Sequence, residues 1–427
     1  MIEPALQLTL GVIVLLLVFD VCQQTRDVVG LLRHMKRERR RPDLSEGLRL
    51  PSTAVVLSLR GPDPRLSETL TALIKQDYPD FQIHVVVDNE RDPVLDDVMR
   101  IQEQDSTGRV RVSVLKNPAR TCSLKCSSLI QAVQDLSSST EVVAFIDGDV
   151  VPHRRWLHEL VLPLANGEAD VAGGNRWYLP PSASVGAMSR YFWNAAYLTG
   201  MWAQGAPWAG TMALHRDTID RIGLLEAWGK AMSVDATLHR CMQQHKLRFR
   251  LVGSLIMPNR EEIGVKEFHR WVTRQMAVIR YSAKATVRMA EIQVGILLVL
   301  HTLLPLIGLI AWRSELPSTA LAAVGLLAGY WSICAVRMVF IERAMRRSLN
   351  ARNEPTGWLG PGHLLMWYPA VIATHYVIGT GVLMALRLKQ VDWRGIRYRL
   401  SSNGIVSMAD YQPYGADWIR TDNHSIV

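Results

Sequence analysis

Three long apolar runs constrain the fold more than any other feature of this 427-residue chain. They cover residues 5–21, 292–312 and 319–341, and a membrane-spanning helix needs about twenty such residues. No small-residue cleavage site follows the first run, so we interpret it as an uncleaved anchor and not as a signal peptide. Only the polar link at residues 313–318 separates the other two runs, which predicts a helical hairpin. The sequence therefore predicts a multi-pass integral membrane protein.

The positive charge of the chain is concentrated directly after the first apolar run. The net charge is +9, and the cluster comprises Arg26, Arg33, Lys36, Arg37, Arg39, Arg40 and Arg41. By the positive-inside rule this places the following region in the cytoplasm, on a bacterial inner membrane or on a eukaryotic organelle membrane that faces the cytosol. Such a cluster also attracts the anionic headgroups of a lipid bilayer. Nucleic acid is not expected as a partner, because the cluster lacks interleaved aromatic residues and the chain contains no recognisable nucleic-acid-binding module.

Between the anchor and the hairpin, short β-rich runs alternate with helical patterns. Strands are predicted at residues 53–59, 82–87, 110–115 and 142–146, with helices at 65–76, 94–104 and 124–136 between them. Largely apolar strands joined by helices are typical of a mostly parallel sheet that is buried on both faces, so the fold class is α/β. In such sheets ligands bind at the carboxyl ends of the strands.

Asp147, Gly148 and Asp149 follow the predicted strand at 142–146. Two carboxylates separated by one residue at a strand end can hold Mg²⁺ or Mn²⁺ against a diphosphate, since these cations prefer oxygen ligands. A nucleotide sugar is therefore the leading ligand hypothesis. The alternative is an ordinary turn, in which aspartate and glycine are also favoured.

Three further segments suggest how the domain meets the membrane. Residues 185–202 form a helix rich in Trp, Tyr and Met, which either fills the core or lines an acceptor groove. Residues 265–289 alternate basic and apolar side chains, which predicts an amphipathic helix in the membrane interface. The apolar segment 364–386 contains Pro369 and His375, and as a span it would place the basic tail outside, so we interpret it as re-entrant or interfacial.

The predicted organisation is as follows. It comprises an anchor (1–25), a basic linker (26–50), a cytoplasmic α/β domain (51–260), amphipathic helices (261–291), a transmembrane hairpin (292–341), a cytoplasmic loop with the re-entrant or membrane segment (342–390) and a cytoplasmic tail (391–427).

Four acidic or basic motifs occur in an order that resembles a known family. Asp88, the Asp147–Asp149 pair, Asp235 and the dipeptide Arg270-Trp271 resemble the D, DxD, D, (Q/R)xxRW series of inverting glycosyltransferase family 2 enzymes. The W-R-G-x-x-Y pattern within residues 391–400 looks more specifically like the ceramide glucosyltransferase and hopanoid glycosyltransferase branch. The resemblance covers residues 50–290, or nearly the whole chain with the tail included, and implies a GT-A fold.

The resemblance implies roles for the donor-side residues. Asp88 would accept hydrogen bonds from the nucleotide's base or ribose, with Asp92 as a possible substitute, and Lys125 would face the nucleotide. Asp147 and Asp149 would bind a divalent cation, Mg²⁺ or Mn²⁺, that neutralises the diphosphate. The alternatives are that Asp92 caps a helix and that Lys125 is a solvated helix residue.

The resemblance also implies a general base. Asp235 would take the proton of the attacking hydroxyl, although Val234 stands where the family has glutamate. The alternative is that Asp235 caps a helix at residues 236–244. Residues 208–212 resemble a stretch that borders the donor and acceptor sites, or form a strand that contains a glycine.

Arg270 and Trp271 would contact phosphate oxygens and shape the acceptor side. Glu267 replaces the family's Gln or Arg, and the neighbouring Arg274 and Gln275 could carry part of this duty. The alternative is simple snorkelling of the basic side chains on an interfacial helix.

These features together predict a membrane-embedded inverting glycosyltransferase. The resemblance implies that it moves one glucose-like sugar from a UDP-sugar to the hydroxyl of a ceramide-, hopanoid- or glycerolipid-like acceptor. Two alternatives remain at this point. A processive polysaccharide synthase shares the same aspartates, and Val234 and Glu267 make an inactive, membrane-anchored binding protein conceivable.

Overall fold

The structure is a computed structural model that describes residues 2–41, 47–282, 284–357, 359–401 and 406–415. The side chains of residues 282–291 lie outside this description, so those of the last third of the predicted amphipathic helix are not considered further. Residues 42–46 of the predicted linker and residues 402–405 and 416–427 of the predicted tail also lie outside it.

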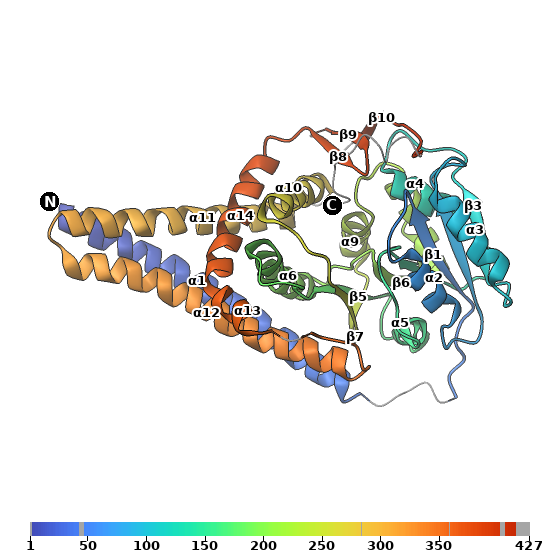
Figure 1. The fold of residues 1–427 in the computed structure, drawn as a ribbon, viewed down its shortest axis with the longest axis horizontal. Coiled ribbons are helices and arrows are strands. Elements are labelled where there is room, and N and C mark those ends of the chain that lie inside the picture. Colours follow the sequence, from blue (N-terminus) through green and yellow to red (C-terminus); the bar gives the residue numbers. More distant parts are fainter. Residues whose placement is uncertain (1, 42–46, 283, 358, 402–405, 416–427) are drawn as a thin grey trace.

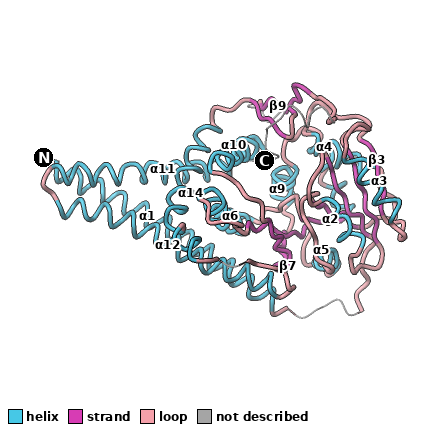
Figure 2. Tube along the Cα trace, viewed as in Figure 1, coloured by secondary structure: helices cyan, strands magenta, loops and turns pink. Residues whose placement is uncertain are grey.

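A seven-stranded sheet forms the centre of the globular domain (Figure 2). Its order is β3-β2-β1-β4-β6-β5-β7. The strands are β1 (Thr53–Leu59), β2 (Phe81–Val87), β3 (Val110–Val114), β4 (Val142–Ile146), β5 (Val171–Tyr178), β6 (Thr211–His215) and β7 (Phe249–Asn259). All pairs are parallel except those of β6 with β4 and β5. The four predicted strands are confirmed to within one residue at each end.

Helices cover both faces of this sheet. One layer comprises α2 (Leu66–Ile74), α3 (Val94–Gln104) and α5 (Trp156–Ala165), and the other comprises α4 (Leu124–Gln134), α8 (Leu224–Trp228) and α9 (Val234–His245), while the short α7 (Arg216–Arg221) follows β6. The neighbouring residues Val55 and Val56 belong to the two opposite cores. Burial of both faces explains why these strands have an uninterrupted apolar sequence.

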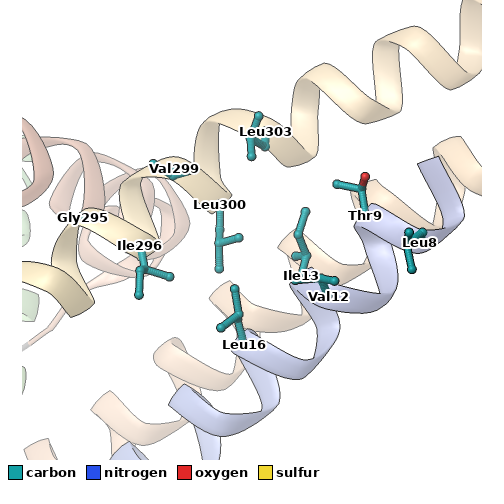
Figure 3. A pocket seen from close by; sticks show the side chains of 10 residues that line it. All are labelled: Leu8, Thr9, Val12, Ile13, Leu16, Gly295, Ile296, Val299, Leu300 and Leu303. Atoms are coloured by element: carbon teal, nitrogen blue, oxygen red, sulfur yellow. The ribbon is translucent and has the colours of Figure 1, made fainter. Parts of the chain in front are cut away.

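Three helices extend together away from the globular domain (Figure 1). They are α1 (Ile2–Arg39), α11 (Lys284–Arg313) and α12 (Pro317–Asn350), which contain the three predicted apolar runs. With α14 (Trp367–Ala385), four helices of the described chain are long and apolar enough to cross a membrane. Between α1 and α11 lies a groove lined by apolar side chains such as Leu16 and Val299 (Figure 3).

A buried carboxylate joins the three long helices. Asp20 of α1 is 6% exposed and accepts hydrogen bonds from Gln293 of α11 at 2.6 Å and from Tyr330 of α12 at 3.0 Å. An acidic group in an apolar bundle requires such partners, so Asp20 specifies how these helices pack.

Helix α14 runs across the bundle beside the globular domain (Figure 1). It follows the short α13 (Pro361–Leu365), and Trp367 at its start packs edge-on against Phe192 of α6 (Val185–Gln204), with ring centroids 5.1 Å apart. At its other end, Arg280 of α10 (Val265–Ser282) donates to the Leu386 carbonyl at 2.7 Å. Both ends of α14 therefore contact helices attached to the globular domain.

The predicted amphipathic segment is divided between two helices. Helix α10 ends at Ser282, and residues 284–289 already belong to α11. Helix α10 is not a bare interfacial helix, because α6, α9 and α14 pack against it and leave Phe268 and Val272 fully buried.

The C-terminal segment forms a small antiparallel sheet that the sequence patterns did not predict. It consists of β8 (Gln390–Trp393), β9 (Ile396–Leu400) and β10 (Val406–Asp410). Arg394 and Gly395, with φ of 46° and 74°, form the two-residue turn between β8 and β9, a geometry that matches the twist of a hairpin. The sheet docks beside α4, where Leu124 N donates to the Tyr398 hydroxyl at 3.1 Å.

Candidate active site

The acidic pair lies in the turn that follows β4. Asp147 forms an ion pair with Lys125 of α4. Arg176 of β5 contacts both carboxylates, with Nη2 at 2.9 Å from Asp149 Oδ1 and 3.7 Å from Asp147 Oδ2. The predicted residues Lys125, Asp147 and Asp149 are thus brought together, and Arg176 joins them from β5.

The electrostatics of this cluster favour positive charge beside the carboxylates. Burial raises the pKa of Asp147, but Lys125 and Arg176 outweigh burial, so the pKa lies below its ordinary value. Burial likewise opposes the charge of Arg176, yet Asp149, Tyr178 and Asp147 together raise its pKa. Asp147 and Arg176 therefore both favour their charged forms.

The chemistry of the acidic pair fits a hard divalent cation. The two side chains supply carboxylate oxygens and are 23% and 21% exposed, so a ligand can reach them from solvent. Within the residues that the structure describes, no group of three or more Asp, Glu, His or Cys side chains could hold a metal ion. Asp147 and Asp149 would therefore supply part of a coordination shell, and water or a substrate would supply the rest.

Arg176 is the main residue that the sequence reasoning missed. Its guanidinium lies 4.9 Å from the ring centroid of Trp208, and Nη1 is 3.5 Å from the Tyr178 hydroxyl. The available signal was a charged residue inside a strand whose other residues are all buried, Val171–Tyr178. A charge in such a strand needs partners, and the ends of the neighbouring strands supply them.

Asp88 lies at the carboxyl end of β2, as predicted, but its oxygens are fully engaged by the chain itself. Arg60 pairs with it, Asn89 Nδ2 donates at 3.1 Å, the Tyr411 hydroxyl at 2.9 Å and Tyr414 N at 3.2 Å. The residue is 1% exposed. We call residues 411–414 the C-terminal strap, since they cover Asp88.

Asp92 has a structural position. One carboxylate oxygen accepts from Gly61 N at 2.8 Å, and the other accepts from Val94 N at the start of α3 at 3.1 Å. Burial raises the pKa of Asp92. Asp92 therefore accepts a hydrogen bond from the first residue of α3, as a helix cap would, although Pro93 occupies the cap position itself.

Asp235 lies in the first turn of α9, which begins at Val234. The residue that caps this helix is Ser233, whose hydroxyl accepts from Ala236 N at 3.1 Å, so the alternative in which Asp235 is the cap is wrong. Asp235 accepts from Ser233 and, at 3.5 Å, from Ala209 N, within the predicted bordering segment 208–212.

An aromatic wall extends from Tyr178 to Trp271. Burial first, and then the charge of Asp235, raise the pKa of Tyr197. Tyr197 stacks on Trp193 with centroids 4.6 Å apart, and Trp193 meets Trp271 edge-on at 4.8 Å. We define the aromatic wall as Tyr178, Trp193, Tyr197, Phe268 and Trp271, and it packs against Val377 of α14.

The other residues predicted on α10 differ in position. Arg270 is 56% exposed, and its ion pair is with Glu267 at 3.3 Å and not with Asp147 or Asp149. Arg274 is half-buried, and burial, followed by the charge of Arg394, lowers its pKa to about 10. Gln275 is also half-buried. Arg394 additionally helps to lower the pKa of Asp147, so the turn of the C-terminal hairpin contributes charge to the site.

The whole chain was compared with known protein families. The family described as glycosyl transferase family 21 matches residues 14–406. The chain belongs to glycosyl transferase family 21. The chain is therefore a glycosyltransferase with a GT-A fold, an enzyme class that transfers a sugar from a nucleotide donor.

Individual proteins match this family 21 chain at low sequence identity. It is 27% identical over 139 residues to the glycosyltransferase AglE of Haloferax volcanii, a match that covers 32% of this chain and 43% of that relative. A mannosyltransferase of Pyrobaculum calidifontis, solved with GDP-Man and Mn²⁺, aligns with a TM-score of 0.48 at 14% identity, covering 88% of this chain and 97% of the other. The structure of GalNAc-T7 with UDP, GalNAc and Mn²⁺ aligns with a TM-score of 0.39 at 13% identity, covering 50% and 44%.

Proposed function

We propose that this family 21 protein is an inverting transferase that moves one sugar from a nucleotide donor, a UDP-sugar, to the hydroxyl of a membrane lipid. The acceptor is a ceramide-, hopanoid- or glycerolipid-like molecule, and the sugar is glucose-like. The observation that carries the proposal is the position of Tyr178 between the acidic pair and the aromatic wall. Arg176, which contacts Asp149, lies 3.5 Å from the Tyr178 hydroxyl, and Tyr178 belongs to the aromatic wall, which packs against α14.

The donor's diphosphate belongs beside Asp147 and Asp149. A divalent cation held by these carboxylates would neutralise the negative charge of the diphosphate. Lys125 and Arg176 are the cationic side chains already at this position, and each can bind phosphate oxygens once the carboxylates are otherwise occupied.

Asp235 is the proposed general base. It would accept the proton of the lipid hydroxyl while the oxygen forms a bond to the anomeric carbon. On the opposite face the bond to the donor phosphate oxygen breaks and its electron pair leaves with the diphosphate, which inverts the anomeric centre. The hydrogen bonds from Ser233 and Ala209 N orient the carboxylate without placing a second acid beside it, in keeping with Val234 at the preceding position.

A lipid acceptor is supported by the aromatic wall and its contact with α14. The aromatic wall has an apolar face of large rings, and Trp271 and Phe268 place it against α14. Because both ends of α14 contact helices of the globular domain, we propose that α14 returns to the side from which it started and lies at the bilayer surface. The catalytic domain and C-terminal tail would then face the cytoplasm, next to the basic segment that follows the first apolar run.

Asp88 is the proposed partner of the nucleoside. Since the strap and Arg60 already satisfy its oxygens, a nucleoside can bind Asp88 only after Tyr411 and Tyr414 have left. Donor binding is therefore coupled to opening of the C-terminal strap.

The proposal is tested with a donor panel offered to the purified protein in a membrane lipid extract with Mn²⁺ or Mg²⁺. A lipid whose mass increases by one hexose is the expected product, and EDTA should abolish it. Asp235→Asn should lose transfer while retaining donor affinity, because Asn cannot accept the proton. Products with many sugars would instead indicate a polysaccharide synthase, and near-normal turnover of Asp235→Asn would remove Asp235 as the base.

A further inference from the structure

Arg176 occupies the position at which the proposed function requires a metal cation. Its guanidinium contacts both carboxylates of the acidic pair, and its side chain is only 17% exposed. A divalent cation that takes the oxygens of Asp147 and Asp149 would compete directly with these contacts. Binding of the cation therefore releases the donors of a largely buried arginine.

A released Arg176 needs another acceptor. Leaving a largely buried guanidinium without a partner is strongly unfavourable, because a buried charge needs a compensating group. Trp208 and Tyr178 flank Arg176 with their rings, at centroid distances of 4.9 and 5.9 Å, and these neutral groups do not replace a carboxylate. Phosphate oxygens can replace the carboxylates, because the planar guanidinium can donate two parallel hydrogen bonds to them.

We propose that Arg176 is an exchangeable partner of the acidic pair. When a divalent cation binds Asp147 and Asp149, Arg176 leaves these carboxylates and binds the phosphate oxygens of the nucleotide donor. The inference rests on the proposed function, since it takes the metal site at Asp147 and Asp149 as given. It assigns one residue to two successive tasks, pairing with the two carboxylates before the cation arrives and neutralising the leaving diphosphate afterwards.

The experiment uses Arg176→Gln and Arg176→Lys in the full-length protein. Mn²⁺ alone is titrated by calorimetry, and the diphosphates UDP and GDP are titrated at saturating Mn²⁺, with UMP and GMP as probes that lack the second phosphate. Arg176→Gln should bind Mn²⁺ at least about tenfold more tightly, because the competing charge is gone. The same variant should bind the preferred diphosphate about 10- to 100-fold more weakly, with a smaller loss for the monophosphate. Arg176→Lys keeps the charge without the fork, so its diphosphate affinity should be intermediate.

Arg190→Gln is the matched control. The Arg190 guanidinium also lies over the Tyr178 ring, 4.2 Å from its centroid. Its contacts are with Glu261 and not with the acidic pair. Its removal should leave the Mn²⁺ affinity within about twofold of the wild type.

The outcomes separate the inference from the proposed function. If Arg176→Gln and Arg176→Lys leave both affinities unchanged, or lower both together with the melting temperature, Arg176 is a structural residue and the exchange is overturned. Asp149→Asn tests the metal site itself. If it binds Mn²⁺ as tightly as the wild type, the metal site of the proposed function fails, and the exchange fails with it.

Discussion

Replacing Tyr411 by phenylalanine tests whether the C-terminal strap competes with the donor. The change removes one hydrogen bond, from the Tyr411 hydroxyl to Asp88 at 2.9 Å. A hydrogen bond to a charged group contributes about 1.5–3 kcal/mol, and the lower limit applies because the strap retains its other bonds, including Tyr414 N to Asp88 and Arg60 to the Gln412 carbonyl. A loss of about 1.5 kcal/mol makes strap opening about tenfold more frequent.

If the closed strap blocks the nucleoside, the apparent donor affinity equals the intrinsic affinity scaled by the open fraction. The donor KM of Tyr411→Phe should therefore fall by up to about tenfold, with kcat little changed. Hydrogen exchange of residues 406–415, measured by mass spectrometry without substrate, should become faster in the same variant. Gly61→Ala should act in the same direction from the other side, since an added Cβ would lie 2.7 Å from the Tyr414 ring and Gly61 has a φ of +72°.

Tyr281→Phe is the control for Tyr411→Phe. It also removes a tyrosine hydroxyl, one that donates to the Leu388 carbonyl at 3.2 Å and does not contact Asp88. Its donor KM should not change. Faster exchange of the strap in Tyr411→Phe with a higher donor KM would refute the reasoning, because the strap would then be part of the donor site. Faster exchange with an unchanged KM would show that the nucleoside does not use Asp88.

Three further predictions concern two ion pairs and the aromatic wall. Arg60→Met should lower the free energy of unfolding by about 3–5 kcal/mol, because it leaves Asp88 buried without its ion-pair partner; Arg60→Met with Asp88→Leu should recover much of this in denaturant titrations. Burial acts against ionisation of Asp147, but the charge of Lys125 is the strongest of the influences that lower its pKa. The ion pair with Lys125 therefore stabilises the fold above the ordinary carboxyl pKa of about 3.9, and this stabilisation is lost as the pH falls through the lowered pKa of Asp147. The melting temperature of Lys125→Met should consequently differ most from the wild type at neutral pH and converge with it toward pH 3. Trp271→Ala should raise the KM for the lipid acceptor about threefold or more and leave the donor KM unchanged, because it removes part of the aromatic wall; a changed donor KM alone would place Trp271 on the donor side instead.

Local patterns were sufficient for the elements of the globular domain. The apolar sequence of β4 and its terminal Asp147-Gly148-Asp149 are readable within eight residues, and the structure places that turn at the carboxyl end of a central strand. The same holds for the apolar runs of α1, α11 and α12, because span length and hydropathy are properties of a single segment. The resemblance also predicted Lys125 and Asp147 as donor-side residues, and the two side chains are in contact in the structure.

Contacts between distant segments were not predictable in the same way. Arg176 follows Asp149 by 27 positions and reaches it only because β5 lies in the same sheet as β4, with β6 between them. The C-terminal sheet contains strands of four or five residues, too short for periodicity to distinguish from a loop. Its hairpin turn, with Arg394 at positive φ, also lacks the Asn-Gly or Asp-Gly pair that would have indicated a turn.

The sequence alone thus determined the strands β1 to β4, which helices are apolar enough for a membrane, and which carboxylates follow strands β2 and β4, because each depends on neighbours along the chain. Only the tertiary structure decided how those carboxylates are used. It saturated Asp88 with Arg60 and a strap more than 300 residues away, and it placed Arg176 on the acidic pair. The physical reason is that a buried charge is defined by the partners that folding brings to it, and these partners come from strands and turns whose order in space does not follow their order in the chain.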